Sequence, residues 1–221
     1  MSLTTEGFAS SPFEREDRGE GDLLPLVSAI LTAAGESTRM GRPKPLLPWH
    51  GVPLLEYQIS SLIEAGVSEV VVVLGHEHEV IVPHVSGDRV NIVVNAAYRE
   101  GKATSVRAGL TAVDAAATDI LLLAVDQPRP PEIISAVIES HIGEDALITS
   151  PRHGGRGGHP LIFSARLRDE LETITEDSQG VREVFRAHAD EVNEVAIDDP
   201  VIRLDINDQD AYEKALRLFG G

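Results

Sequence analysis

Residues 31–48 read LTAAGESTRMGRPKPLLP, and the rest of the chain can be placed relative to this stretch. It begins inside the mostly apolar run Leu26–Ala33, which is typical of a buried parallel strand. Gly35 and Gly41 then bracket a loop. Because glycine tolerates positive φ and has no side chain, such a loop can turn successive N–H groups toward an anion. The stretch therefore predicts a strand that leads into an anion-binding loop.

The loop also concentrates positive charge at Arg39, Arg42 and Lys44. The chain has only three lysines, and two of them, Lys44 and Lys102, lie in loops that we assign to one site. An ordinary strand-to-helix turn with a solvated basic surface would show the same glycines and arginines. These residues alone therefore leave both interpretations open.

Two known phosphate-binding motifs do not fit. A P-loop needs G-x-x-x-x-G-K-[ST], but the spacing from Gly35 to Gly41 is one residue too long and Arg42 and Pro43 follow it. A dinucleotide-binding loop opens directly into a helix, which the prolines after Gly41 prevent.

A third pattern does fit. Residues 33–44, AAGESTRMGRPK, match A-A-G-x-S-x-R-M-G-x-x-K. This segment resembles the nucleotide loop of the MobA/MocA-like nucleotidyltransferases, a family that includes molybdopterin cytidylyltransferases. The resemblance extends from Leu26 to the C-terminus through four later segments: Asn95–Gly101, Asp126–Pro128, Gly158–Pro160 and Asp205–Asn207. Two segments depart from the family pattern. Ala96 replaces the usual proline, and residues 177–182 match Gly-Asp-x-Gly-x-Arg only in part.

The resemblance implies a set of site residues. The nucleotide would contact Ala33, Ala34, Gly35, Ser37, Arg39, Gly41, Lys44, Asn95, Gly101 and Ser105. The acceptor would contact Gln127, Gly158 and His159, and Mg²⁺ would bind Asp126 and Asp205. Arg39, Lys44 and Asp126 would be the catalytic residues. Ala34 favours CTP over GTP, although Thr32 departs from the usual leucine.

The implied reaction is chemically consistent with these residues. A phosphate on the acceptor would attack the α-phosphorus of the nucleotide and release pyrophosphate. A phosphate monoester is already mostly ionised at neutral pH, so no general base is required. Magnesium and the cations Arg39 and Lys44 would then stabilise the developing charge. Asp126 and Asp205 also suit ordinary turns, and that structural interpretation stays open for both.

Three functions remain open at this stage. The first is a molybdopterin-type cytidylyltransferase, whose partners would be CTP, a phosphorylated small-molecule acceptor and an enzyme that handles that acceptor. The second keeps the loop but uses a sugar phosphate or polyol phosphate, since a fold does not fix a function. The third is a non-catalytic module that binds nucleotides and handles a cofactor.

The rest of the chain alternates strands and helices. Strands are expected at 69–74, 90–95, 120–125, 146–149, 161–163, 194–197 and 201–204. Helices are expected at 54–65, from 104, and at 131–142, 165–174, 181–188 and 211–219. This alternation predicts a three-layer α/β/α sandwich with a mostly parallel, doubly wound sheet. The family resemblance implies that this sandwich is of the nucleotide-diphospho-sugar transferase type.

Two loop segments are ambiguous. The glycine-rich segment 153–160 is too rich in glycine to be regular, and either a flexible excursion or a lid would explain it. His76 and His78 lie at the exit of the 69–74 strand beside glutamates. They fit either metal ligands or, more often for such a pair, a solvated loop.

Composition limits the remaining possibilities. A formal charge of −17 argues against a nucleic-acid surface, and the chain has no cysteine. No apolar run approaches the ~20 residues of a membrane span or resembles a signal peptide, which predicts a cytoplasmic protein without a membrane partner. Residues 1–22 are polar and acidic and are expected to form a mobile tail, followed by one domain at 23–221.

Overall fold

The computed structural model describes residues 25–219. The predicted tail, residues 1–22, and both ends of the predicted domain (23–24 and 220–221) lie outside this range.

The core is a mixed sheet whose strands run in the order β10-β7-β9-β6-β1-β4-β5, with β8 paired to β7. Strands β1, β4, β5, β6, β7 and β10 run in one direction, while β9 is antiparallel to both of its neighbours. The strand bounds are β1 Val27–Ala33, β4 Glu69–Leu74, β5 Val90–Val94, β6 Asp119–Ala124, β7 Ile148–His153, β8 Arg156–Gly157, β9 Leu161–Ser164 and β10 Val192–Ala196. A separate hairpin pairs β2 (Pro48–Trp49) with β3 (Val52–Pro53).

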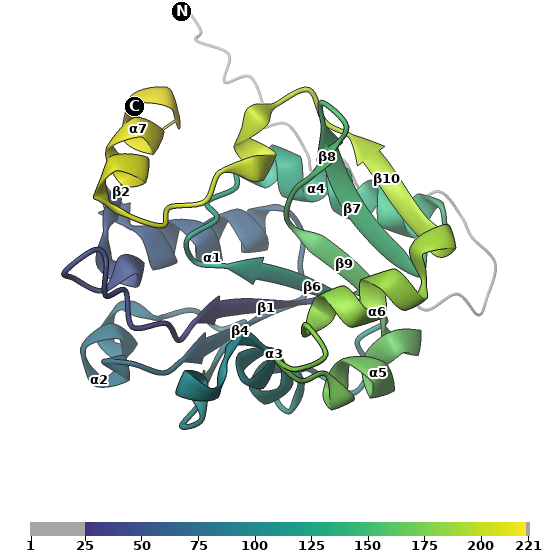
Figure 1. The fold of residues 1–221 in the computed structure, drawn as a ribbon, viewed down its shortest axis with the longest axis horizontal. Helices are drawn as coiled ribbons and strands as arrows, with labels where there is room; N and C mark the ends of the chain where they lie inside the picture. The colour runs from purple at the N-terminus through teal and green to yellow at the C-terminus, as the bar shows by residue number, and fades with distance from the viewer. Residues whose placement is uncertain (1–24, 220–221) are drawn as a thin grey trace, which may run out of the picture.

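Helices cover both faces of the sheet (Figure 1). Helices α1 (Leu54–Glu64), α4 (Pro131–Gly143) and α7 (Gln209–Phe219) pack with alternate β1 residues such as Leu31 in one apolar cluster. On the opposite face, Ile30 packs with α3 (Lys102–Leu110), α5 (Arg168–Thr173) and α6 (Val181–Ala187). The predicted three-layer α/β/α sandwich is therefore confirmed. The remaining short elements are α2 His78–Ile81 and the 3-10 helices η1 Lys44–Leu46, η2 Val82–His84, η3 Tyr98–Glu100, η4 Ala165–Leu167, η5 Ala189–Glu191 and η6 Pro200–Arg203.

The parallel strands bring the predicted landmarks to one edge. β1 pairs with β4 on one side and with β6 on the other, so that Thr32 lies opposite both Val73 and Ala124. The loop after β1 and the Asp126–Pro128 segment after β6 therefore leave the sheet at the same carboxyl edge. In open α/β sheets, ligands bind outside this edge.

The strand predicted at Val201–Leu204 is wrong, because this segment contains the 3-10 helix η6. Pro200 begins η6, and the Asp199 side chain accepts a hydrogen bond from the N–H of Val201 at 2.8 Å. Val201 and Ile202 are buried, so their apolar character reflects packing rather than a strand.

The expectation of irregular structure across 153–160 is also wrong in part. Residues 148–157 form the hairpin β7–β8, in which Arg152 pairs with Gly157 and His153 with Arg156. The connection is Gly154-Gly155, with φ values of 56° and 74°. Two successive residues at positive φ make the tight turn that joins antiparallel strands, and this explains Gly154 and Gly155.

Candidate functional site

A cleft of about 1010 Å³ opens at the carboxyl edge of the sheet. It is lined by the loop after β1, the start of α3, the end of β6, the β7–β9 segment and α6. The predicted site residues that line it are Ala33, Ala34, Gly35, Ser37, Arg39, Lys44, Gly101, Ser105, Asp126, Gln127, Gly158 and His159. Three predicted site residues are not among its lining residues: Gly41, Asn95 and Asp205.

The loop after β1 is held by its own hydrogen bonds. Ser37 has a φ of 52°, and its carbonyl oxygen accepts the N–H of Met40 at 2.8 Å. The Ser37 hydroxyl accepts the N–H of Lys44 at 3.0 Å. Gly41, with a φ of 65°, completes the turn. Ser37 and Gly41 therefore shape the loop and position Lys44 at the start of η1.

Gly35 leaves open space beside the backbone. Apart from Gly35 and its two chain neighbours, no atom among residues 25–219 lies within 4 Å of the position that a β-carbon at Gly35 would occupy. Gly35 also lines the cleft. A side chain would fill this space, so glycine leaves room for a ligand to approach the main chain.

Lys44 and Asp126 meet inside the cleft. The Nζ atom of Lys44 lies 2.8 Å from Oδ2 of Asp126, and the two side chains are 13% and 19% exposed. These residues are 82 positions apart in the sequence. The fold thus places the lysine of the loop against the carboxylate after β6, as expected if both belong to one site.

Arg42 does not join them. Its guanidinium lies over the ring of Tyr212 in α7, 5.8 Å from the centroid, and it does not line the cleft. The Tyr212 hydroxyl donates a hydrogen bond to the Pro48 carbonyl at 2.5 Å. Of the three cations in the loop, Arg39 and Lys44 face the cleft, while Arg42 fixes the loop to α7.

Asp205 does not line the cleft, but its segment is hydrogen-bonded to the segment that carries Asp126, and the two form one corner. Gln127 Nε2 donates to Asp205 Oδ1 at 2.8 Å, and the N–H of Ile206 donates to the Asp126 carbonyl at 2.8 Å. Gln58 holds this corner from α1 by donating to the Gln127 carbonyl at 2.7 Å. One or two carboxylates completed by water and substrate phosphates are a common Mg²⁺ environment, so this corner fits the ion.

His76 and His78 offer no comparable site. Within residues 25–219, no group of three or more His, Cys, Asp or Glu side chains is arranged to hold a metal. His76 Nδ1 lies 3.2 Å from the Tyr98 hydroxyl, and His78 Nδ1 lies 3.2 Å from the Gly75 carbonyl.

Asn95 supports the cleft from behind. It is 6% exposed, and its amide donates to the hydroxyls of Thr104 at 2.9 Å and Ser105 at 3.0 Å. These bonds fix the end of β5 to α3, which begins at Lys102. Ser105 reaches the cleft and Asn95 holds it in place.

Arg129 is a site residue that sequence reasoning missed. It is fully buried and donates hydrogen bonds to four carbonyl groups, those of Pro128, His159, Ile202 and Leu204. It thereby ties together the segments that carry Asp126, His159 and Asp205. Burial lowers the pKa of Arg129 to about 10, while the nearby aspartates act in the opposite direction. An arginine next to Asp-Gln-Pro gave no sequence signal of this role.

His159 lies half-buried in the cleft wall. The main-chain N–H of His159 donates a hydrogen bond to the Ile202 carbonyl at 2.9 Å. Burial lowers the pKa of His159 to about 4, and the positive charge of Arg129 adds to the effect. His159 is therefore neutral at pH 7 and contributes hydrogen-bonding groups rather than charge.

The sequence placed Lys102 in a loop of the site, but the other members of a second group of cleft residues were missed. The cations Lys102, Arg152, Arg182 and Arg186 line the cleft, together with Glu176 and Phe185. They come from α3, β7 and the region of α6. Because they are scattered singly along the sequence, only the fold brings them together.

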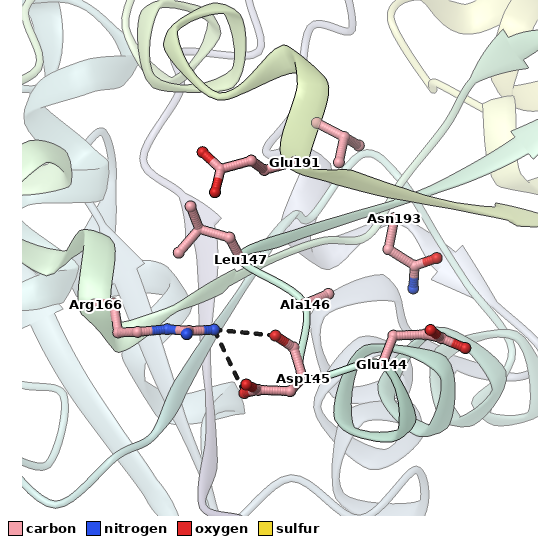
Figure 2. A pocket seen from close by; sticks show the side chains of 8 residues that line it. Glu144, Asp145, Ala146, Leu147, Arg166, Glu191 and Asn193 are labelled. Carbon is pink, nitrogen blue, oxygen red and sulfur yellow. Dashed lines mark hydrogen bonds and ion pairs between the residues drawn. The ribbon is translucent and has the colours of Figure 1, made fainter.

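A smaller hollow of about 400 Å³ lies at the opposite edge of the sheet (Figure 2). It is lined by residues 144–147, Arg166 and residues 191–193, next to the starts of β7 and β10. Arg166 binds the Asp145 carbonyl there at 3.0 Å. It contains no predicted site residue.

Across residues 25–219, no helix is long and apolar enough to cross a membrane.

Comparison with known sequences adds independent findings. A family model described as a MobA-like NTP transferase domain matches residues 29–192. The chain is 34% identical over 181 residues to nicotine blue oxidoreductase of Paenarthrobacter nicotinovorans. The aligned region covers 74% of this chain and 83% of that protein. It is 31% identical over 139 residues to molybdenum cofactor cytidylyltransferase of Escherichia coli K12, covering 62% and 70% respectively.

Solved structures agree with this result. The crystal structure of Rv0371c from Mycobacterium tuberculosis H37Rv aligns with a TM-score of 0.77 at 28% identity, covering 87% of this chain and 98% of that one. Its complex with manganese aligns with a TM-score of 0.70 at 26% identity, covering 87% and 99%.

Proposed function

Because this chain belongs to the MobA-like NTP transferase domain family, we propose that it transfers CMP from CTP to the phosphate of a molybdopterin-type acceptor, with release of pyrophosphate. The observation that carries this proposal is the contact between Lys44 and Asp126, 2.8 Å apart in the cleft below the loop. The loop supplies cations for phosphates, and the end of β6 supplies a carboxylate for a metal ion. These are the parts that nucleotidyl transfer requires.

Each residue has a defined part in the proposed reaction. The attacking phosphate oxygen forms a bond to the α-phosphorus while the bond to the pyrophosphate leaving group breaks. Arg39 offers a forked contact to phosphate oxygens, and Lys44 offers a point charge. The acceptor phosphate is already ionised, with a second pKa of about 6, so no protein group has to remove a proton. Catalysis then consists of positioning and charge stabilisation.

Asp126 and Asp205 would hold the magnesium ion, and the ion would offset negative charge on the phosphates. Asp126 is engaged with Lys44, so nucleotide and metal binding would replace this ion pair with contacts to phosphate and cation. The manganese complex of Rv0371c supports a divalent cation in this fold.

The preference for CTP rests on Ala34 in the loop and on the similarity to the cytidylyltransferase of Escherichia coli. A sugar phosphate or polyol phosphate remains the alternative acceptor, since acceptor contacts come from other segments than the loop. Nicotine blue oxidoreductase raises a second candidate, a redox reaction in the same cleft. This candidate predicts binding of a nicotinamide nucleotide instead of CTP.

Thermal unfolding tests the proposal directly. We expect CTP with Mg²⁺ to raise the melting temperature more than GTP, ATP, UTP, NADH or NADPH. A ligand present at 100 times its Kd stabilises the native state by about 2.7 kcal/mol, which is readily measured. Pyrophosphate release with molybdopterin as acceptor then measures turnover.

Two variants make this test specific. Asp126→Asn removes the charge proposed to bind the metal with little change in shape, and we expect it to abolish the Mg²⁺-dependent part of the shift. Asp145→Asn removes an exposed carboxylate at the opposite hollow and should leave the shift intact. Stabilisation by NADH or NADPH alone would favour the redox candidate, and equal shifts in both variants would contradict the role of Asp126.

A further inference from the structure

We propose that the acceptor carries a second anionic group, apart from the phosphate that attacks the nucleotide, and that Lys102, Arg182 and Arg186 bind it. This inference rests on the proposed nucleotidyl transfer and names the chemical class of its second substrate. That class is a phosphorylated small molecule with a further anionic group.

The three cations form what we call the basic wall. Lys102 begins α3, while Arg182 and Arg186 lie one helical turn apart on α6. The two helices start side by side, because a β-carbon at Gly180 would stand 3.8 Å from the β-carbon of Ala103. All three cations line the cleft. The basic wall is therefore a feature of the fold and not of one segment.

The gathering of unpaired cations on one cleft distinguishes this wall. Some cations have carboxylate partners within 4.0 Å, as in Arg99–Glu36, Arg166–Asp145 and Arg168–Glu172, and other cations that are unpaired within residues 25–219, such as Arg107 and Arg217, do not line the cleft. In the described part of the chain, Lys102, Arg182 and Arg186 have no such partner. This is notable in a chain with 36 acidic and 19 basic residues. Cations left without partners around one cleft create a local positive field that attracts an anion.

The cleft beside the wall already holds one carboxylate. Oε1 of Glu176 accepts the N–H of Ala103 at 2.5 Å, at the start of α3. Glu176 is the only acidic residue besides Asp126 among the residues that line the cleft. Arg152 also lines the cleft and pairs with Glu194, which does not. One glutamate therefore offsets only part of the charge of the three cations of the wall.

The cleft is large for a small-molecule site. Its volume of about 1010 Å³ lies at the upper limit of the range of 300–1,000 Å³ that is typical of small-molecule sites. Arg39 and Lys44 belong to the triphosphate end, so the basic wall is left for the acceptor. Val181, Phe185 and Leu161 line the same cleft and offer apolar contact to the body of that acceptor.

The experiment compares two probes on one scaffold, a hexose monophosphate and a hexose bisphosphate. Both are titrated calorimetrically into protein saturated with Mg²⁺ and a methylene-bridged CTP analogue, which occupies the triphosphate end without reacting. We expect the bisphosphate to bind at least about tenfold more tightly than the monophosphate. In Arg182→Gln/Arg186→Gln this preference should fall below about threefold, with the affinity for the CTP analogue unchanged.

The matched control is Arg107→Gln/Arg217→Gln, which removes two exposed cations that do not line the cleft and should keep the preference. The inference is overturned if wild type binds the two probes equally or binds neither, or if the wall variant keeps the preference. Loss of CTP-analogue binding in wild type would instead count against the proposed function. In that case the same two probes, titrated without nucleotide, still decide whether the wall prefers a second anion.

Discussion

At the scale of single residues, Lys44 and Arg42 provide a matched pair. Both are cations of the same loop, but Lys44 faces Asp126 in the cleft while Arg42 lies over Tyr212. We expect Lys44→Gln to lower kcat by a factor of 10²–10³, about 3 kcal/mol, as for the loss of one transition-state donor. Arg42→Gln should change kcat by less than about fivefold. Pyrophosphate release measures both, and similar losses would show that loop geometry, and not the Lys44 charge, is what matters.

His159 predicts a specific dependence of stability on pH. Its pKa is lowered from 6.5 to about 4 in the folded state, first by burial and then by Arg129. As pH falls below 6.5, the unfolded chain binds a proton at this position before the native state does. The stabilisation contributed by His159 is therefore complete above pH 6.5 and is lost as pH falls to about 4. It amounts to about 3 kcal/mol.

Urea unfolding of wild type and His159→Gln between pH 4 and 7 tests this expectation. Subtracting the two free energies of unfolding removes contributions from the other histidines. The difference should shrink as the pH falls, and a difference that is constant with pH would show that His159 titrates normally.

Individual site residues could be predicted from the sequence where a short motif names them. Ser37, Lys44 and Asp126 follow strands whose ends the apolar pattern already marks, and all three line the cleft. Arg129 could not be predicted, because its four carbonyl partners lie in three segments that only the folded chain brings together.

At the scale of elements, α3 is positioned by a glycine. A β-carbon at Gly109 would stand 2.5 Å from Ile30 Cγ2 and 3.1 Å from Val73 Cγ2. Gly109→Ala should therefore push α3 from the sheet and cost about 1–3 kcal/mol, as overpacked cores do. Gly143→Ala, at the end of α4, should be neutral or gain up to about 1 kcal/mol, because no described atom beyond its chain neighbours and the backbone of its own helix lies within 4 Å of the new β-carbon. Chemical denaturation measures both, and equal effects would contradict this packing argument.

Helices and strands could be predicted from the sequence where the apolar pattern extends over many residues. The continuous run of β4 and the amphipathic helix α4 were both expected within a residue or two of their bounds. Segment 201–204 was misread because Val201 and Ile202 are buried, and burial requires apolar residues in any backbone conformation. In the hairpin β7–β8, Gly154 and Gly155 form the turn, although the sequence predicted irregular structure there.

At the scale of the whole molecule, the alternation of strands and helices was enough to predict the three layers and the shared edge of β1 and β6. It was not enough to place β9 antiparallel between β6 and β7, since pairing partners leave no mark on the apolar pattern. It also did not predict that α6 would lie beside the start of α3, and this placement creates the basic wall.

The position of β9 has a consequence for how such a protein can change over evolutionary time. In the sheet, β7 and β10 are joined to the strands that carry the nucleotide loop through β9 alone. Four residue pairs join β9 to β6, and two join it to β7. Gene duplicates can therefore diversify the outer strands and their loops, which the proposed function assigns to the acceptor, without altering the inner strands that shape the loop. The nucleotide loop can then be inherited unchanged while the proposed acceptor site changes.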